Sequence, residues 1–304
     1  MDLGKLNTSL YNIKNILYDN IKAVQGKPIK GHGELSRRIK QRHRTFWGQP
    51  DSEIVRNTKM NASDPIEKWK DVTNWQRKLS NKYNAREFAK KHGCRVPDLY
   101  WKGRNIEAID FSKLPEQFVI RPTIGHSSNN VFLMNKNYNQ MDNKFYSAEE
   151  ISKVMEAALN KDARLEFLIE EFVRDEQGNY VIPVNYKIHT FNGEIAGINV
   201  LNKVGPRKGT MRAYDENWNM INNIACDLPV APYQKPPNCI KEIVTHAKIL
   251  SKAYEIYVRV DFFATDKGAV FNEFTPTPSV GDYFTPEADK KFISYWDKYC
   301  KGLI

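Results

Sequence analysis

Apolar and polar residues alternate along several short stretches of the chain, a pattern that is typical of β-strands. Six such stretches predict strands over residues 117–121, 166–173, 186–191, 194–200, 257–264 and 269–275. Asn192-Gly193 separates the third stretch from the fourth and is a strong signal for a β-hairpin. Asp266, Lys267 and Gly268 separate the last two stretches, which predicts a second hairpin with a three-residue loop.

Other stretches repeat apolar residues every three or four positions, which predicts amphipathic helices. One helical face is formed by Ile240, Ile243, Val244, Ala247 and Leu250. Ser147 and Glu150 have the spacing of a capping box, so we expect a second helix from there to about residue 159. Residues 6–21 and 34–44 predict two N-terminal helices, the second of them basic. Helices mixed with antiparallel hairpins favour an α+β architecture.

The composition is that of an ordinary globular protein, with 304 residues of which 41% are hydrophobic and 27% charged. Lys and Arg total 46 against 36 Asp and Glu, and the resulting charge of +10 favours anionic partners, or serves solubility alone. No apolar run is long enough to cross a bilayer, and residues 1–24 lack the apolar segment of a signal peptide. The four cysteines are scattered, so we expect reduced thiols in a cytoplasmic protein.

The second hairpin carries two acidic residues, Asp261 and Glu273, on strands that otherwise look buried. With a three-residue loop, Asp261 lies opposite Glu273 and Arg259 lies opposite Thr275, with Cβ atoms about 5 Å apart. Two opposed carboxylates repel each other unless a cation lies between them, and Mg²⁺ prefers such oxygen ligands. The alternative is a solvated strand face with an ordinary ion pair. A two-residue loop would shift the register by one residue and remove the pairing.

A polar loop follows the strand that ends at Arg121, and it contains Gly125, Ser127 and Ser128. Backbone N–H groups and hydroxyls in such a loop can bind phosphates, although a surface hairpin has the same composition. Lys187 and His189 share one face of the strand over residues 186–191. A Lys at that position can reach a phosphate as a point charge, or it can be solvated.

Taken in order, these segments resemble the ATP-grasp superfamily, and in particular its TupA-like group, which is associated with surface-polymer synthesis. The resemblance runs from about Lys82 to Pro286. Its most specific motifs are residues 185–187 with 191–193, residues 213–218, Arg259-Val260-Asp261 and residues 272–276. It implies an ATP-grasp fold in which two α+β lobes hold ATP between them.

The resemblance also implies roles for individual residues. Lys82, Arg121 and Lys187 match cations that contact the nucleotide, and Gly125, Ser127 and Ser128 match the loop over its triphosphate. Glu170, Glu171, Phe172 and Val173 match the linker that binds adenine and ribose. Asp261 and Glu273 match the Mg²⁺ ligands, Thr275 stands where an Asn ligand is usual, and Arg259 matches the catalytic Arg. Arg212 precedes a family-like segment and is a further catalytic candidate.

The implied reaction is an ATP-dependent ligation of a carboxylate to an amine through an acyl phosphate, in the synthesis of a surface polymer. One alternative is an ATP-grasp kinase that phosphorylates a glycan or small molecule. Another is a non-catalytic polyanion-binding protein, because residues 37–44 are strongly basic. We expect three regions: a helical and basic extension (1–60), an α/β part (61–115) and the nucleotide-binding lobes (116–304).

Overall fold

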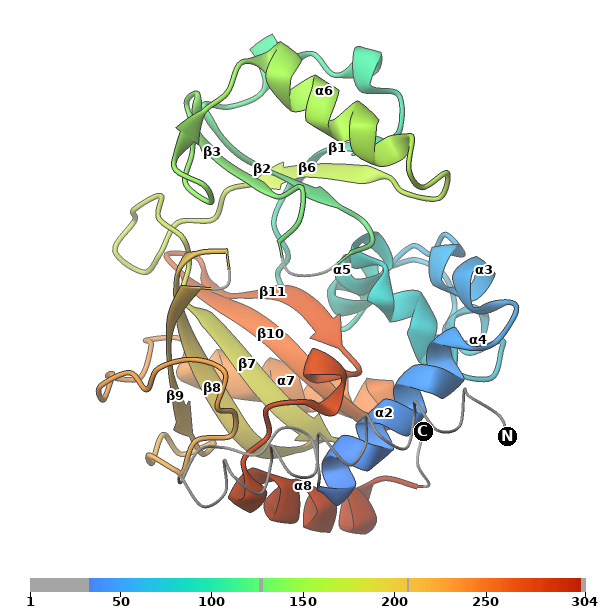
Figure 1. Cartoon of the computed structure of the whole chain (residues 1–304), viewed down its shortest axis with the longest axis vertical. Helices are drawn as coiled ribbons and strands as arrows, with labels where there is room; N and C mark the ends of the chain where they lie inside the picture. Colours follow the sequence, from blue (N-terminus) through green and yellow to red (C-terminus); the bar gives the residue numbers. More distant parts are fainter. Residues whose placement is uncertain (1–32, 126–127, 207, 302–304) are drawn as a thin grey trace, which may run out of the picture.

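The computed structural model describes residues 33–125, 128–206 and 208–301, and Figure 1 shows two lobes, each built on one antiparallel sheet. The helix expected over residues 6–21 and the loop residue Ser127 lie outside the described residues. Within the described part of the chain, no helix is both long and apolar enough to cross a membrane.

The small lobe is a six-stranded sheet with one long helix, α6 (Ala148–Leu159), on its outer face (Figure 1). Its strands lie in the order β1 (Leu99–Gly103), β6 (Phe167–Glu171), β2 (Gln117–Pro122), β3 (Phe132–Asn135), β4 (Tyr138–Asn139) and β5 (Lys144–Phe145). The capping box expected at Ser147 and Glu150 is confirmed at the start of α6. Ile151 and Met155 of this helix are buried against Ile120 and Ile169 of the sheet.

The large lobe is a five-stranded sheet that carries both predicted hairpins. Its strands lie in the order β11 (Gly268–Thr275), β10 (Tyr257–Thr265), β7 (Asn185–Phe191), β8 (Glu194–Gly205) and β9 (Lys208–Tyr214). The hairpin at Asn192-Gly193 is confirmed, and both residues have positive φ, at 49° and 100°. Such values are those of the two-residue turns that match the twist of a hairpin.

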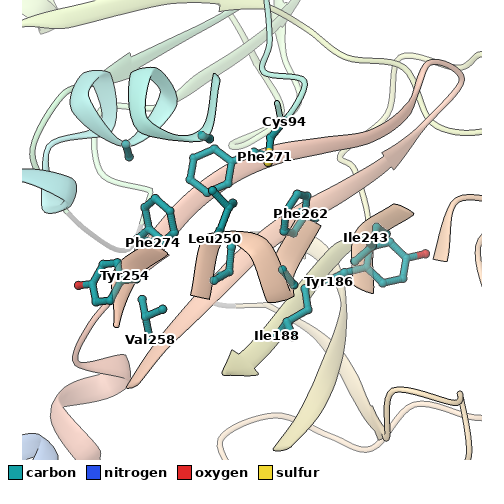
Figure 2. Packing of buried hydrophobic residues seen from close by; sticks show 14 of the residues in the cluster. Cys94, Tyr186, Ile188, Ile243, Leu250, Tyr254, Val258, Phe262, Phe271 and Phe274 are labelled. Atoms are coloured by element: carbon teal, nitrogen blue, oxygen red, sulfur yellow. The ribbon is translucent and has the colours of Figure 1, made fainter. Parts of the chain in front are cut away.

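Helix α7 (Ile240–Tyr254) covers one face of the large sheet. Figure 2 shows Phe262, Phe271 and Phe274 of the sheet against Ile243, Leu250 and Tyr254, all of which belong to the largest buried cluster. Because side chains alternate along a strand, packing of these apolar residues under α7 leaves the polar residues of β10 and β11 on the opposite face. That opposite face is where the predicted acidic site lies.

The N-terminal helices pack directly on the large lobe. They are α2 (Glu34–Trp47), α3 (Ser52–Asn57), α4 (Ile66–Trp69), η1 (Trp75–Ser80) and α5 (Lys82–Lys91). Helix α2 contacts the 3-10 turn η4 (Pro278–Gly281) and helix α8 (Pro286–Tyr299), which lie next to it in Figure 1. Short 3-10 turns η2 (Ile106–Ala108) and η3 (Phe111–Lys113) complete the fold. The division at residues 60 and 115 stays a prediction, although β1 shares a sheet with β2 to β6.

Candidate functional site

The hairpin of β10 and β11 brings Asp261 opposite Glu273, and Arg259 opposite Thr275, in the register that the sequence predicts. The turn differs from the expectation, because Thr265 pairs with Gly268 and the loop has two residues instead of three. A β-bulge at Asn272 adds one residue to β11 between the turn and Glu273. The bulge shifts the register back by one residue, so the opposed carboxylates are retained for a reason that the sequence analysis did not foresee.

Asp261 lies at the centre of this face and is fully buried. Arg259 donates two hydrogen bonds to it, from Nε to Oδ1 at 2.7 Å and from Nη2 to Oδ2 at 2.9 Å. Lys187, its register partner on β7, places Nζ 3.5 Å from Oδ2. Nη2 of Arg259 also lies 3.6 Å from Oε1 of Glu273. The expected repulsion between the two carboxylates is therefore offset by these cations.

The donor set at this position fits a magnesium ion. Asp261 and Glu273 supply carboxylate oxygens on neighbouring strands, and Glu273 remains about one-third exposed. Mg²⁺ in proteins usually takes one or two carboxylates together with phosphate oxygens and water. No group of three or more acidic, His or Cys ligands is found among the described residues. The Oγ1 of Thr275 accepts a hydrogen bond from Arg259 at 2.9 Å, so this hydroxyl has a protein partner as well.

Two buried amide oxygens face the same side of the sheet as Lys187. Asn185 lies two residues before Lys187 on β7, and Asn199 is the register partner of Lys187 on β8. The Oδ1 atoms of both side chains have no hydrogen-bond partner among the residues that the structure describes. A buried acceptor without a partner is costly, so these oxygens are suited to hydrogen bonds from a bound molecule or water.

The charge of Glu273 raises the pKa of three lysines that come from different elements. Burial lowers the pKa of Lys187, and Arg259 lowers it further, whereas Asp261 and Glu273 raise it. Burial also lowers the pKa of Lys82, at the start of α5, against the opposing effect of Glu273. Lys203 has its pKa lowered by burial and by Lys187, and raised by Glu273. Lysines gathered in this way offer a site for an anion with several negative charges.

Lys203 was not among the predicted site residues. It lies on β8, which continues to Gly205 instead of ending near residue 200, and alternation puts it on the face of Asn199. Its Nζ donates a hydrogen bond to Oγ of Ser128 at 2.5 Å. Lys203 could have been predicted only from the extra length of β8. The basic residues between 202 and 212 obscured this length, because they suggest a solvated loop.

The loop between β2 and β3 lies next to these lysines. Lys82 Nζ donates to the backbone oxygen of Gly125 at 3.1 Å, and the backbone N–H of Lys82 donates to Thr123 at 2.8 Å. Gly125 has a φ of 124°, which a residue with a Cβ rarely adopts. Gly125 and Ser128, which the sequence places in a candidate phosphate-binding loop, therefore lie next to Lys82 and Lys203.

The predicted nucleotide contacts of the small lobe are paired with each other. Arg121 donates from Nε to Oε2 of Glu170 at 2.5 Å, and from Nη1 to Oδ1 of Asn272 at 3.0 Å. Glu170 is almost fully buried, and Arg86 places Nε 3.3 Å from its second oxygen. In this structure Glu170 thus orients two arginines. The contact with Asn272 ties the end of β2 to the bulge in β11.

The linker after β6 leaves the small sheet at Glu171, whose Oε1 lies 2.5 Å from Nζ of Lys267. Phe172 and Val173 are buried, and Phe172 packs with Leu133 in a small apolar cluster. The backbone of Phe172 and Val173 forms no hydrogen bond with another described residue. Backbone groups of this kind can pair with the edge of a nucleotide base, as the resemblance implies.

Arg212 does not reach the acidic face, which corrects the expectation that it lies at the site. It pairs with Val200, and Val200 is buried in the cluster under α7 on the other face of the sheet. Its Nε donates to the backbone oxygen of Ala231 at 2.7 Å. Directly opposed residues point to the same face, so strand alternation separates Arg212 from Asp261.

His189 lies next to Arg259 in the register of β7 and β10. Its Nδ1 is 3.0 Å from the hydroxyl of Tyr257, and its ring packs against Phe284 and Phe292. Burial lowers the pKa of His189 well below the usual value, and Arg259 acts in the same direction. His189 is therefore neutral at physiological pH.

A two-lobed fold with a polar loop after β2, a buried linker after β6 and opposed carboxylates is typical of the ATP-grasp class. The TupA-like ATPgrasp family model matches residues 65–295, which is well over half of the chain, and the protein belongs to this family. No curated protein matches the sequence. The family match and the geometry of the site agree on the ATP-grasp fold.

Similar solved structures include two ligases. D-alanine–D-alanine ligase from Helicobacter pylori is 19% identical with a TM-score of 0.45, over 73% of this chain and 59% of that one. VanG D-Ala:D-Ser ligase from Enterococcus faecalis is 18% identical with a TM-score of 0.48, over 74% of this chain and 62% of that one. The chain thus spans about three-fifths of the length of these two proteins.

Proposed function

We propose that the protein is an ATP-dependent ligase that joins a carboxylate to an amine. The observation that carries the proposal is the row Glu273, Asp261 and Lys187 across three adjacent strands, with Arg259 bonded to Asp261. Two acids and two cations on one sheet face suit the binding of a metal–triphosphate, whose charges they complement. The backbone of Phe172 and Val173 is available to the base of the nucleotide.

The chain's own residues would position the reactants and stabilise charge. Lys82, Lys187 and Lys203 would neutralise phosphate oxygens, as the effect of Glu273 on the pKa of all three supports. Asp261 and Glu273 would hold Mg²⁺, which when bound neutralises charge on the phosphates. Arg259 would stabilise the charge that develops on the transferring phosphoryl group.

The proposed reaction has two steps, and no residue acts as a nucleophile. A carboxylate oxygen of the substrate attacks the γ-phosphorus of ATP, which forms an acyl phosphate and releases ADP. An amine then attacks the acyl carbon, the C–O bond to phosphate breaks, and an amide, inorganic phosphate and a proton are released. The TupA-like family assignment supports a role in joining an amino acid or related group to a surface polymer.

A polyanion-binding function is disfavoured by the contacts of the basic helix α2. Arg37 and Arg38 form ion pairs with Glu34, and Arg38 also contacts Asp297. Lys40 lies 3.2 Å from a carboxylate oxygen of Asp282. Arg42 is fully buried. Most of the basic run is therefore engaged within the protein.

The proposal is tested by release of ADP from MgATP in the presence of a panel of amino acids and uronic-acid glycans. Hydroxylamine in a parallel reaction converts an acyl phosphate to a hydroxamate, which identifies the carboxylate. We expect ADP and hydroxamate to appear in equal amounts with at least one carboxylate. A stable phosphorylated product without an amine would indicate a kinase. If the protein binds MgATP but releases neither ADP nor hydroxamate, the ligase assignment is contradicted.

A further inference from the structure

Arg42 of helix α2 is a fully buried cation with an incomplete set of hydrogen-bond partners. Its Nε and Nη2 have no such partner among the described residues, and its guanidinium packs over the ring of Trp296 at 4.4 Å. Burial lowers the pKa of Arg42 to about 10, so the side chain is still charged at neutral pH. A buried charge without a carboxylate partner is costly, which favours a specific reason for its position.

The remaining nitrogen of Arg42 binds the strands that carry the candidate site. Its Nη1 donates to the backbone oxygen of Tyr257 at 2.7 Å and to that of Pro276 at 3.4 Å. Tyr257 lies two residues before Arg259 on β10, and Pro276 directly follows Thr275 at the end of β11. One side chain thus fixes the backbone next to both members of the Arg259–Thr275 pair.

Tyr257 extends this contact to a third strand. Its ring lies 5.5 Å from the guanidinium of Arg42, and its hydroxyl is 3.0 Å from Nδ1 of His189. His189 is the register partner of Arg259 on β7. Arg42 is therefore linked through Tyr257 to His189, which is one of the two register partners of Arg259.

Helix α2 also holds the segment that follows Pro276. Nδ1 of His43 lies 3.3 Å from Oγ1 of Thr277. Beyond it, Ser279 and Val280 have φ values of 47° and 51°, a left-handed conformation that a β-branched residue rarely adopts. Such strain persists only where surrounding contacts fix it, and it is concentrated at functional sites.

We propose that Arg42 is a positioning residue, which holds the ends of β10 and β11 so that Arg259 keeps Asp261 oriented toward a divalent cation. The inference rests on the proposed function. Helix α2 would then help to position the metal site in addition to packing on the large lobe. A purely structural Arg42 would affect the stability of the fold and leave the affinity for metal unchanged.

The test measures binding of Mn²⁺ by electron paramagnetic resonance, using full-length protein saturated with the ATP analogue AMP-PNP. Loss of a residue that orients a metal ligand typically weakens metal affinity about 10- to 100-fold, and we expect a loss in this range for Arg42→Met. We expect the affinity for AMP-PNP without metal to change much less. Arg42→Lys, which keeps a charge and one donor, should recover part of the metal affinity.

Arg38→Met is the matched control. Arg38 lies one helical turn before Arg42, and its guanidinium is 5.7 Å from the same Trp296 ring, but it bonds to Glu34 and Asp297 at the surface. This variant should bind Mn²⁺ like the unmodified protein.

A folded Arg42→Met protein with unchanged Mn²⁺ affinity overturns the inference. If Arg42→Met does not fold, unchanged affinity in Arg42→Lys overturns it. If the unmodified protein binds neither AMP-PNP nor Mn²⁺, the proposed function itself fails.

Discussion

Arg259 is the residue at which most contacts of the candidate site meet. It donates to Asp261 and Thr275 and lies 3.6 Å from Glu273. Burial is the largest single influence on the pKa of Arg259 and lowers it, but Asp261 and Glu273 together raise it by more, so the pKa of Arg259 is raised. The planar guanidinium donates two hydrogen bonds to Asp261 and still reaches Thr275 and Glu273, a fixed geometry that an ammonium group does not offer.

We expect Arg259→Lys to lower kcat by about a hundredfold, which is typical of losing one preorganised donor. The affinity for ATP should change much less, because charge at this position matters most in the transition state. The measurement is steady-state ADP release with the carboxylate substrate that hydroxylamine trapping identifies. A raised KM for ATP with an unchanged kcat would mean that Arg259 is a binding residue.

Lys187 on β7 and Lys208 on β9 allow a matched comparison within the same sheet. Lys187 faces Asp261 and Glu273, whereas Lys208 is exposed at the start of β9. Lys187→Met should weaken AMP-PNP binding at least about tenfold, because it removes a desolvated charge next to the phosphates. Lys208→Met should have no measurable effect in the same calorimetric titration. Equal effects of the two substitutions would place the nucleotide elsewhere.

Individual residues differ in how far the sequence predicted their positions. The hairpin that carries Asp261 and Glu273 was predictable, but their direct pairing matches the expectation only because the bulge at Asn272 offsets the shorter turn. The pairing of Arg121 with Glu170 was not predictable, because it depends on the contact of β2 with β6 across 49 residues of sequence. Arg212 was misplaced because a sequence motif does not state on which face of a strand a residue lies.

At the scale of elements, the two hairpins of the large lobe show what local patterns can and cannot specify. The Asn192-Gly193 turn followed from its sequence, since both residues tolerate the positive φ that it requires. The bulge at Asn272 did not, because alternation of apolar and polar residues is compatible with either loop length. Asn272 accepts a hydrogen bond from Arg121 of the small lobe, a partner that is invisible in the hairpin sequence.

Gly193→Ala tests the first hairpin. Gly193 has a φ of 100°, which costs a residue with a Cβ about 1–2 kcal/mol, and the added Cβ would lie 3.4 Å from the side chain of Lys252. We expect the free energy of unfolding, measured by urea denaturation, to fall by this amount. AMP-PNP affinity should be unchanged, since the turn lies at the far end of β7 from Asn185. Unchanged stability would show that the turn adopts another conformation in solution.

At the scale of the whole molecule, polar contacts join the two lobes around the site. Arg121 bonds to Asn272, Lys267 pairs with Glu171, and the backbone N–H of Lys82 donates to Thr123. The general α+β architecture was predictable from the mixture of helices and hairpins. The close packing of α2 on the large lobe was not, because the basic composition of residues 37–44 does not indicate a packing partner.

One buried and two half-buried histidines predict how the stability of the fold depends on pH. Burial lowers the pKa of His43, His92 and His189 below the model-peptide value of 6.5, so the unfolded chain binds more protons than the folded protein just below this pH. Stability should therefore fall as the pH decreases from 6.5 toward 5, by at most about 1.4 kcal/mol per pH unit for each histidine. His189→Gln should flatten this part of a pH series of urea denaturation curves. An unchanged slope would mean that His189 is protonated in the folded protein.

The face formed by Glu273, Asp261 and Lys187 is proposed to bind ATP together with Mg²⁺. Calorimetric titration of the full-length protein with AMP-PNP, with and without Mg²⁺, tests it most directly, and Glu273→Gln is the companion variant. We predict saturable binding of one nucleotide that is at least about tenfold tighter with Mg²⁺, and a loss of that metal-dependent gain in Glu273→Gln. No heat of binding from folded protein in the presence of Mg²⁺, or an undiminished gain in Glu273→Gln, would contradict the account.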